Sequence, residues 1–206
     1  MTFYYILILF HFFFIIHKLY TFIMKKTILI FIISYIFMIY YKITVYAKKY
    51  TINNNEESFQ KMIDILHYMQ NSDELILYFE DDYYDIYEFS VDYDILVTVS
   101  SNITIIGNNN GTVFDFNNER KGVFIFSHTE DKVKSVTFEN IIFKNARSVD
   151  PSIDLVRFVS NTDKLFSTFN NCTFQNIFFN IIAIFSSCTK SNHEEASLLI
   201  NNCKFM

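Results

Sequence analysis

Three segments near the C-terminus repeat one order of apolar and polar positions, apolar-x-Asn-apolar-x-Phe. They are residues 136–145, 167–176 and 198–205. Aligned on their central asparagines, Asn140, Asn171 and Asn202, the copies lie 31 residues apart both times. A fixed period of this size indicates a solenoid, in which each repeat is one turn and the stacking of turns buries the core.

Within each copy, apolar positions alternate on both sides of the asparagine. Val136 and Phe138 share one strand face, and Ile141 and Phe143 share a face of the next strand, because side chains alternate with period two. The odd step between the two pairs predicts a bend at Asn140, since asparagine tolerates left-handed backbone and bonds to nearby backbone groups. Each copy is therefore predicted to be strand, corner, strand.

Stacked turns place equivalent positions in rows, because parallel strands lie about 4.8 Å apart. The three central asparagines are expected to form a buried ladder of amide hydrogen bonds. Two interior rows are also predicted: Phe143, Phe174 and Phe205, and Ile141, Cys172 and Cys203.

Cys172, Cys188 and Cys203 are the three cysteines, an odd count that leaves at least one thiol unpaired. A disulfide could bridge Cys172 and Cys203 in adjacent turns. Burial as small apolar residues is the favoured interpretation. The redox state of all three stays open.

The strand–Asn–strand corner resembles that of right-handed parallel β-helix proteins, the pectin-lyase-like superfamily. The segments 138–140 and 174–176 also loosely resemble the repeats of polymorphic outer-membrane adhesins. Upstream, residues 102–108 and 111–116 resemble the first turn of many β-helices. The resemblance covers roughly residues 55–206 and implies an all-β, right-handed parallel β-helix solenoid.

Two apolar stretches, residues 2–23 and 27–46, open the chain. Met24-Lys25-Lys26, the apolar run after it and Ala47 before Lys48 are typical of a secretory signal. Both stretches are also long enough to cross a bilayer at about 20 residues each. We predict a signal peptide or membrane anchor at 24–47, and at 1–23 either upstream translation or an extra membrane segment. The remaining chain is expected outside the cytoplasm, either extracellular or membrane-anchored.

Residues 48–72 contain a predicted amphipathic capping helix. Asn53 to Asn55 supply an N-cap, acids follow in the first turn, and the apolar stripe is Phe59, Met62, Ile63, Leu66 and Met69. Such a helix would cover the first, otherwise unpaired, edge of a solenoid.

Residues 73–206 are assigned to the β-helix turns. Outside the three copies, strands are predicted at 75–79, 87–91, 95–99, 103–106, 112–116 and 123–126. The sequence stops inside its third copy without a closing cap, which predicts a fragment of a longer β-helix or end-to-end self-association.

The net charge of −5 hides an asymmetry. Residues 1–47 hold four of the 17 basic residues and no acid, so residues 48–206 hold 13 basic and all 22 acidic residues, a net of −9. This balance argues against nucleic acid and anionic lipid surfaces as partners. Membrane contact is expected through the N-terminal apolar segments alone.

The acidic run Glu80, Asp81, Asp82 and Asp85 offers carboxylate oxygens for calcium. It lacks the glycine and the spacing of an EF-hand loop, so a solvated acidic turn is favoured. The tyrosines around it, Tyr83, Tyr84, Tyr87 and Tyr93, could stack on sugar rings, although Tyr87 alternates with Phe89 and is favoured as a core or half-core residue.

Polysaccharide lyases of the resembled superfamily use calcium-bridged carboxylates and an arginine base. The resemblance makes Asp150, Asp154 and Arg157 weak catalytic candidates. Hydrolases of this fold need two or three aspartates on adjacent strands, and the repeat strands lack such a cluster. We predict no catalytic activity and no cofactor.

Three histidines, His67, His128 and His193, are isolated, and each is predicted to be a surface or loop residue rather than a ligand. Asn102 and Asn110 begin glycosylation sequons at predicted turns. Asn171 begins a third sequon, but its predicted burial argues against modification.

The expected function is a secreted or membrane-tethered, non-catalytic surface, adhesion or glycan-binding β-helix, with a polysaccharide or cell-surface glycan as partner. One alternative is a truncated or diverged polysaccharide lyase or hydrolase. Another is a decayed gene fragment.

Overall fold

The structure is a computed structural model and describes residues 47–90, 92–148, 150, 152–186 and 197–206, together with 17, 26, 30, 31 and 33–35. The chain separates into two units, Met1–Val45 and Tyr46–Met206. In the first unit the described residues are helical. The described part of the chain contains no helix both long and apolar enough to span a membrane. The predictions for 1–23 and 24–47 fall mostly outside the described residues.

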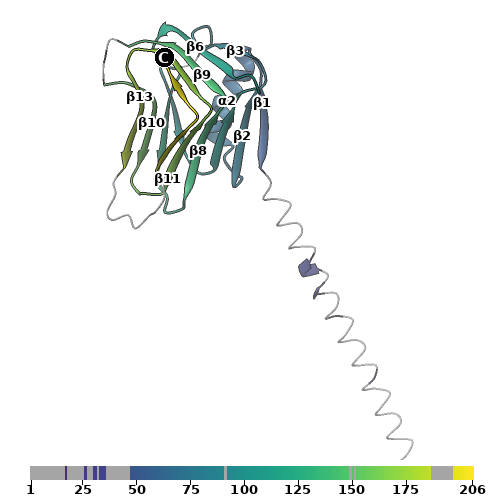
Figure 1. Cartoon of the computed structure of the whole chain (residues 1–206). Helices are drawn as coiled ribbons and strands as arrows, with labels where there is room; N and C mark the ends of the chain where they lie inside the picture. Colours follow the sequence, from purple (N-terminus) through teal and green to yellow (C-terminus); the bar gives the residue numbers. More distant parts are fainter. Residues whose placement is uncertain are drawn as a thin grey trace, which may run out of the picture. The chain divides into compact units, whose positions relative to one another are not determined.

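The second unit is an all-β parallel solenoid of about five turns (Figure 1). Every strand pairing in the described residues is parallel, and three sheets form the sides of the coil. The six-stranded sheet is β1 (Lys48–Ile52), β2 (Glu74–Phe79), β5 (Asn102–Ile106), β8 (Lys134–Glu139), β11 (Leu165–Asn170) and β14 (Leu198–Asn201). The five-stranded sheet is β3 (Tyr83–Asp85), β6 (Thr112–Glu119), β9 (Ile141–Ala146), β12 (Thr173–Ile177) and β15 (Lys204–Phe205). The four-stranded sheet is β4 (Asp94–Thr98), β7 (Val123–His128), β10 (Asp154–Ser160) and β13 (Asn180–Ser186).

The predicted register of the repeats is confirmed. Phe138 of β8 pairs with Phe169 of β11, and Phe143 of β9 pairs with Phe174 of β12. The rings of each pair stack nearly parallel, with centroids 5.1 and 5.2 Å apart. Phe205 of β15 continues the second row at 5.1 Å from Phe174. Offset stacking of this kind adds to the free energy gained from burying the rings.

Asparagines stand at the predicted corners and have left-handed backbone, with φ of 56° at Asn140, 52° at Asn171 and 54° at Asn202. Asn171 Nδ2 donates to Asn140 Oδ1 at 2.7 Å, and Asn202 Nδ2 donates to Asn171 Oδ1 at 3.1 Å. The prediction that this ladder is buried is wrong: Asn171 and Asn202 are exposed and Asn140 is half-buried. A corner residue with positive φ turns its side chain outward, so the amides bond to one another along the outer edge.

A second ladder, absent from the sequence predictions, runs along the other end of the five-stranded sheet. Asn176 Nδ2 donates to Asn145 Oδ1 at 3.1 Å, and Asn145 Nδ2 donates to both Asp115 oxygens at 3.0 and 3.1 Å. Asn145 and Asn176 also have positive φ, 56° and 54°. The two ladders thus run across the sheet at both ends of its strands, and they hold consecutive strands in register.

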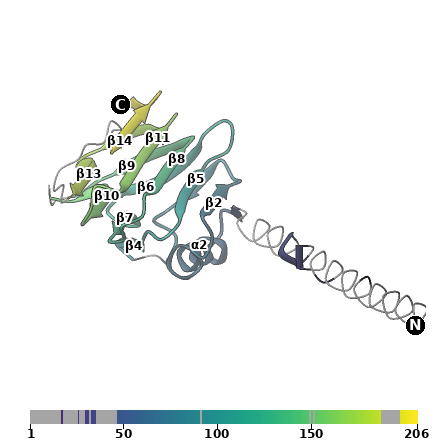
Figure 2. The same ribbon diagram turned by 90° about the horizontal axis from the view of Figure 1, so that it is seen from below.

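Helix α2 (Glu56–Tyr68) follows β1 and contacts β1 and β4 (Figure 2). Asn55 caps it, since its side chain accepts a hydrogen bond from Ser58 N at 2.8 Å. Its apolar face buries Phe59, Met62, Ile65 and Leu66. Ile63 is only partly buried and Met69 is exposed, so the buried stripe is narrower than predicted.

The prediction of a strand at 87–91 is wrong, because the chain turns there. The strand of this turn is β3, inside the acidic run, where Tyr84 is fully buried and its hydroxyl donates to Ile52 O at 2.5 Å. Asp85 then closes a turn by accepting hydrogen bonds from the N–H groups of Tyr87 at 3.1 Å and Glu88 at 3.4 Å. Tyr87 is consequently 45% exposed and is not a core residue.

His128 is fully buried in a strand, contrary to the prediction of a surface or loop residue. It ends β7, where the inward alternation of the strand continues for one more position. Its Nδ1 lies 3.0 Å from Val99 O and its Nε2 lies 2.8 Å from Lys132 O. Both ring nitrogens thus face backbone acceptors, and the side chain holds two loops to the end of the sheet. His67 is exposed, and His193 lies outside the described residues.

Cys172 and Cys203 are both free thiols. Cys172 is buried in the row that begins with Ile141, and its backbone N–H donates to Cys203 Sγ at 3.4 Å. Burial raises the pKa of the Cys172 thiol to about 12, so this group stays neutral and unreactive at physiological pH. Cys188 lies outside the described residues.

Candidate functional site

The acidic run does not gather into a cation site. Asp81 accepts a hydrogen bond from Asn54 N at 2.6 Å, Asp82 accepts one from the Asn108 side chain, and Asp85 closes the turn described above. Glu80, Asp81 and Asp82 are exposed, whereas Asp85 is half-buried within β3. No group of three or more potential metal ligands exists among the described residues. These carboxylates hold loops in place.

The weak catalytic candidates are also held in structural contacts. Asp154 is buried at the start of β10 and forms an ion pair with Arg157, whose Nε lies 2.6 Å from Asp154 Oδ2. The Arg157 guanidinium also donates to Ser152 O at 3.1 Å and lies 5.6 Å from the Phe185 ring centroid. Asp150 is exposed and accepts hydrogen bonds from the N–H and hydroxyl of Ser152, which lower its pKa. An arginine held this way is poorly placed to act as a base.

The glycosylation candidates differ in accessibility. Asn102 is half-buried at the start of β5, and its side-chain oxygen accepts a hydrogen bond from Ser135 N at 3.1 Å. Asn110 is exposed in the loop before β6. Asn171 is exposed too, so burial is no longer an argument against it, although its amide takes part in the ladder.

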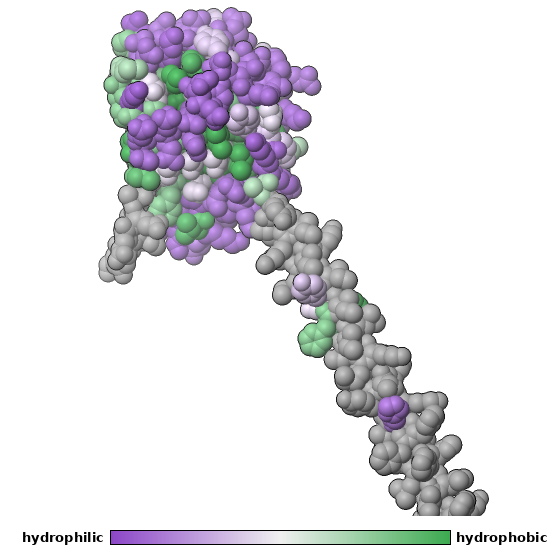
Figure 3. Space-filling view, turned by 45° about the vertical axis from the view of Figure 1, so that its right-hand side comes forward, coloured by the Kyte–Doolittle hydropathy of each residue, from purple (hydrophilic) through white to green (hydrophobic). Residues whose placement is uncertain are grey.

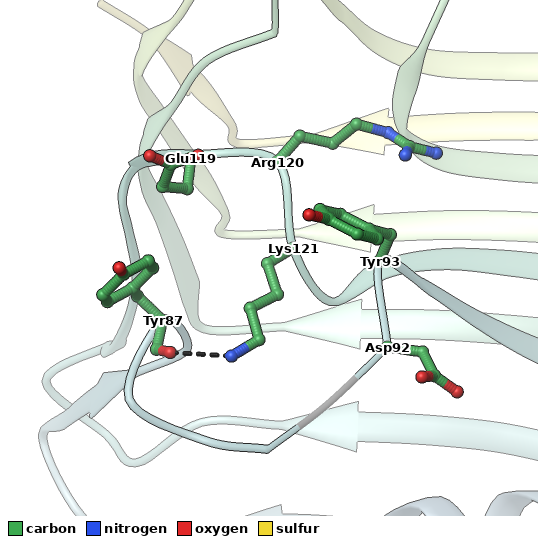
Figure 4. Close-up of a pocket in the computed structure, with 6 residues that line it drawn as sticks. All are labelled: Tyr87, Asp92, Tyr93, Glu119, Arg120 and Lys121. Atoms are coloured by element: carbon green, nitrogen blue, oxygen red, sulfur yellow. Dashed lines mark hydrogen bonds between the residues drawn. The ribbon is translucent and has the colours of Figure 1, made fainter.

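A cavity of about 420 Å³ lies where the loop between β3 and β4 meets the loop between β6 and β7 (Figure 4). Six residues line it: Tyr87, Asp92, Tyr93, Glu119, Arg120 and Lys121. Its volume falls within the range of about 300–1,000 Å³ that is usual for small-molecule sites.

Backbone and lysine contacts hold the two loops of this pocket together. Lys121 Nζ donates to Tyr87 O at 2.8 Å and to Phe89 O. Gly122 N donates to Asp92 O, and Val123 N donates to Tyr93 O, both at 3.1 Å. The pocket is therefore preformed by the parallel ladder that continues into β4 and β7.

The two tyrosines of the pocket are exposed, Tyr87 by 45% and Tyr93 by 67%. In Figure 4 the Lys121 side chain runs between them. Lys121 Nζ lies 5.5 Å from the Tyr87 ring centroid, and the Arg120 guanidinium lies 5.7 Å from that of Tyr93. Cation–π contacts at these distances hold the rings in place while one side of each stays open to solvent.

The charged groups of the pocket are of two kinds. Arg120 Nη2 is paired with Asp94 Oδ1 at 2.5 Å, whereas Arg120 Nε is shielded from solvent and has no acceptor among the described residues. The carboxylates of Asp92 and Glu119 are exposed and form no hydrogen bond or ion pair with any described residue. In Figure 4 the two carboxylates stand on opposite sides of the pocket.

Sequence reasoning singled out Tyr87 and Tyr93 as sugar-stacking candidates but missed Asp92, Glu119, Arg120 and Lys121. These four lie in two loops that come together only when consecutive turns stack. The available signal was Glu119-Arg120-Lys121-Gly122 between two predicted strands, about one turn after the tyrosine-rich segment.

The surface seen in Figure 3 is mainly hydrophilic, with scattered apolar side chains. The last turns carry several exposed apolar residues: Phe178, Phe185, Leu199, Ile200, Phe205 and Met206. Phe205 is 54% exposed, whereas Phe174 in the same row is buried. Rows that are interior in earlier turns therefore become accessible in the last turns.

Comparison of the chain with protein-family models, with curated proteins and with solved structures finds no match.

Proposed function

We propose that this protein is a non-catalytic, glycan-binding solenoid. The pocket between Tyr87 and Tyr93 is the observation that carries the proposal, since exposed, fixed aromatic rings beside unpaired carboxylates suit the mixed apolar and hydroxylated surface of a sugar. The Asp154–Arg157 ion pair supports binding without turnover, because the arginine is engaged by a buried carboxylate.

The test combines binding and turnover. The full chain is incubated with insoluble polysaccharides and with a panel of soluble oligosaccharides, and bound protein is measured. Polygalacturonate is assayed in parallel, with and without calcium, for unsaturated products that absorb in the ultraviolet and for new reducing ends. We expect binding to at least one glycan and neither product.

An ultraviolet-absorbing product or new reducing ends, lost in Asp154→Ala or Arg157→Ala, would instead support a diverged lyase or hydrolase. A chain that shows no binding and no turnover would favour the gene-fragment alternative. Asp150→Ala, the third candidate from the sequence, is assayed beside these two variants, because that carboxylate is exposed and accepts its hydrogen bonds from Ser152.

We propose further that the coil is right-handed and pectin-lyase-like, with α2 covering its first edge. Parallel crossovers are right-handed in about 98% of cases, and the buried face of α2 joins the same apolar core as the strands. An experimental structure with a left-handed coil, or with α2 detached from the first turn, would contradict this assignment.

The proposed location is outside the cytoplasm. The signal-like segment at 24–47 and the start of β1 at Lys48 support it, since cleavage after Ala47 would leave the solenoid whole. Mass spectrometry of the chain produced through a secretory pathway should give an N-terminus at Lys48. An uncleaved product that sediments with membranes would indicate an anchor.

A further inference from the structure

Most polar side chains inside the solenoid hold the fold, but those of the pocket leave binding capacity free. The Asp92 and Glu119 carboxylates and Arg120 Nε have no partner among the described residues. A buried donor without an acceptor is costly, and a ligand oxygen that reached it would remove this cost. The pocket therefore offers acceptors at its rim and one unsatisfied donor beside Tyr93.

The charge balance limits which ligands fit. Arg120 and Asp94 neutralise each other in their ion pair. The lining residues themselves carry two acidic and two basic groups, and with Asp94 counted as the partner of Arg120 the net charge around the pocket is −1. Lys121 is also turned to the carbonyls of Tyr87 and Phe89, so most of its hydrogen-bonding capacity is used. An anionic ligand would meet uncompensated carboxylates, and like charges at short range repel each other.

The remaining chemistry suits a flat, uncharged ligand rich in hydroxyl groups. Tyr87 and Tyr93 offer apolar ring surface, against which the C–H faces of a pyranose ring pack. Carboxylates accept strong, charge-assisted hydrogen bonds from hydroxyl groups. A neutral sugar supplies both features, whereas a uronic acid supplies the wrong charge.

We infer that the pocket formed by Tyr87, Tyr93, Asp92 and Glu119 binds a neutral pyranose unit of a glycan and discriminates against uronic acid units. This inference rests on the proposed glycan-binding function and narrows it to one site and one ligand class. It also separates the protein from binders of acidic pectin, the substrate class tested above for turnover.

The sharpest probe is a pair of ligands with the same sugar backbone, one charged and one neutral. Hexagalacturonate and its fully methyl-esterified form share one skeleton, and only the first is anionic. Binding of both to the full chain is measured by isothermal titration calorimetry, together with neutral hexasaccharides of glucose, mannose, galactose and N-acetylglucosamine. We expect at least one neutral ligand to bind, and the ester to bind at least tenfold more tightly than the acid.

Variants of the pocket residues test whether the glycan binds in this pocket. Tyr93→Ala and Tyr87→Ala should each lower the affinity for the neutral ligand at least tenfold. Tyr68→Ala removes a tyrosine that is 80% exposed but does not line the pocket, and it should leave affinity unchanged. Glu119→Gln removes one negative charge, so it should reduce the preference for the ester over the acid.

The outcomes separate the inference from the function on which it rests. Tighter binding of the acid, or neutral binding unaffected by Tyr87→Ala and Tyr93→Ala, would overturn the inference while glycan binding stands. Absence of binding to every glycan in the panel would overturn both.

Discussion

The corners between the six-stranded and five-stranded sheets are short in the later turns of the solenoid and longer in the earlier turns. Corners between the six-stranded and five-stranded sheets span one residue at Asn140 and two each at 171–172 and 202–203, but three at 80–82 and five at 107–111. The segment joining β3 to β4 is longer still, at eight residues. The pocket lies where this eight-residue connection meets the three-residue connection between β6 and β7, as function commonly does on loops set by a rigid scaffold.

Aromatic packing differs in the same way. Later turns stack equivalent rings nearly parallel, as at Phe138–Phe169 with 3° between ring planes. In earlier turns equivalent rings meet edge to face, as at Tyr84–Phe114 with 75° and Phe114–Phe143 with 87° between ring planes. Constant turn length gives identical neighbours, whereas variable turn length forces each ring to find its own fit. Regularity thus stabilises the fold, and departures from it make room for a site.

The largest expected effect is at the junction of the two regions. Phe138 is fully buried, stacks on Phe169 and meets Phe124 and Phe126 edge to face. Phe138→Ala should lower the free energy of unfolding by about 3–5 kcal/mol through lost burial and a cavity, measured by chemical denaturation. The exposed Phe178 is the control, and a similar loss in Phe178→Ala would contradict this account.

The second effect tests the irregular corner. Gly107 occupies the place of the corner asparagines, and a Cβ there would lie 2.2 Å from Asn140 O, a backbone atom. Gly107→Ala should cost about 3 kcal/mol because neither backbone can move freely. If urea midpoints of variant and wild type coincided, the close approach between the two regions would be disproved.

The third prediction concerns pH. Burial raises the pKa of Cys172 from 9.0 to about 12. The folded state therefore keeps the proton over a pH range in which the unfolded state loses it, and stability should fall as pH rises above 9. Cys172→Ala should show a smaller fall between pH 8 and pH 11 in thermal unfolding. If stability fell equally with pH in the variant and in the wild type, the row Ile141–Cys172–Cys203 would be hydrated.

A smaller effect is expected in the ladder. Asn171→Ala should cost about 1–2 kcal/mol, because alanine tolerates the left-handed corner poorly and cannot bond to its neighbours. Asn170→Ala, one residue earlier on the outer face of β11, should stay within about 0.5 kcal/mol. Equal losses in the free energy of unfolding at the two positions would show that the corner does not fix the register.

The smallest effect on stability is expected in the pocket. Tyr93→Ala should change the free energy of unfolding by no more than about 0.5 kcal/mol, since the ring is 67% exposed. A loss above about 1 kcal/mol would assign Tyr93 to the scaffold and weaken the contrast between regular, stabilising turns and irregular, binding ones.

The sequence predicted the later turns well because their pattern repeats without interruption. The alternation around Asn140 determined strand faces, the corner and the rows of phenylalanines. It could not predict that the ladder faces outward, since that follows from backbone φ at the corner. It also missed β1, β3, β10 and β13, which lie outside the three aligned copies.

The candidate site was less predictable for a different reason. Tyr87 was expected in the core from its alternation with Phe89, but the Asp85 turn reverses the chain first. The sequence pattern assigned no role to Glu119, Arg120 and Lys121, and only the stacking of turns places them beside Tyr87 and Tyr93. Pocket residues that come from different turns carry no common spacing.

The constant repeat length of the later turns also has a consequence for folding. Each new pairing closes a loop of about 30 residues, so every added turn has nearly the same entropic cost and gains a nearly identical interface. Growth can then proceed one turn at a time from any stable pair of neighbours. The turns around β8 and β11 have the shortest corners and the best-matched rings, so we expect the coil to nucleate there and to order the pocket loops last.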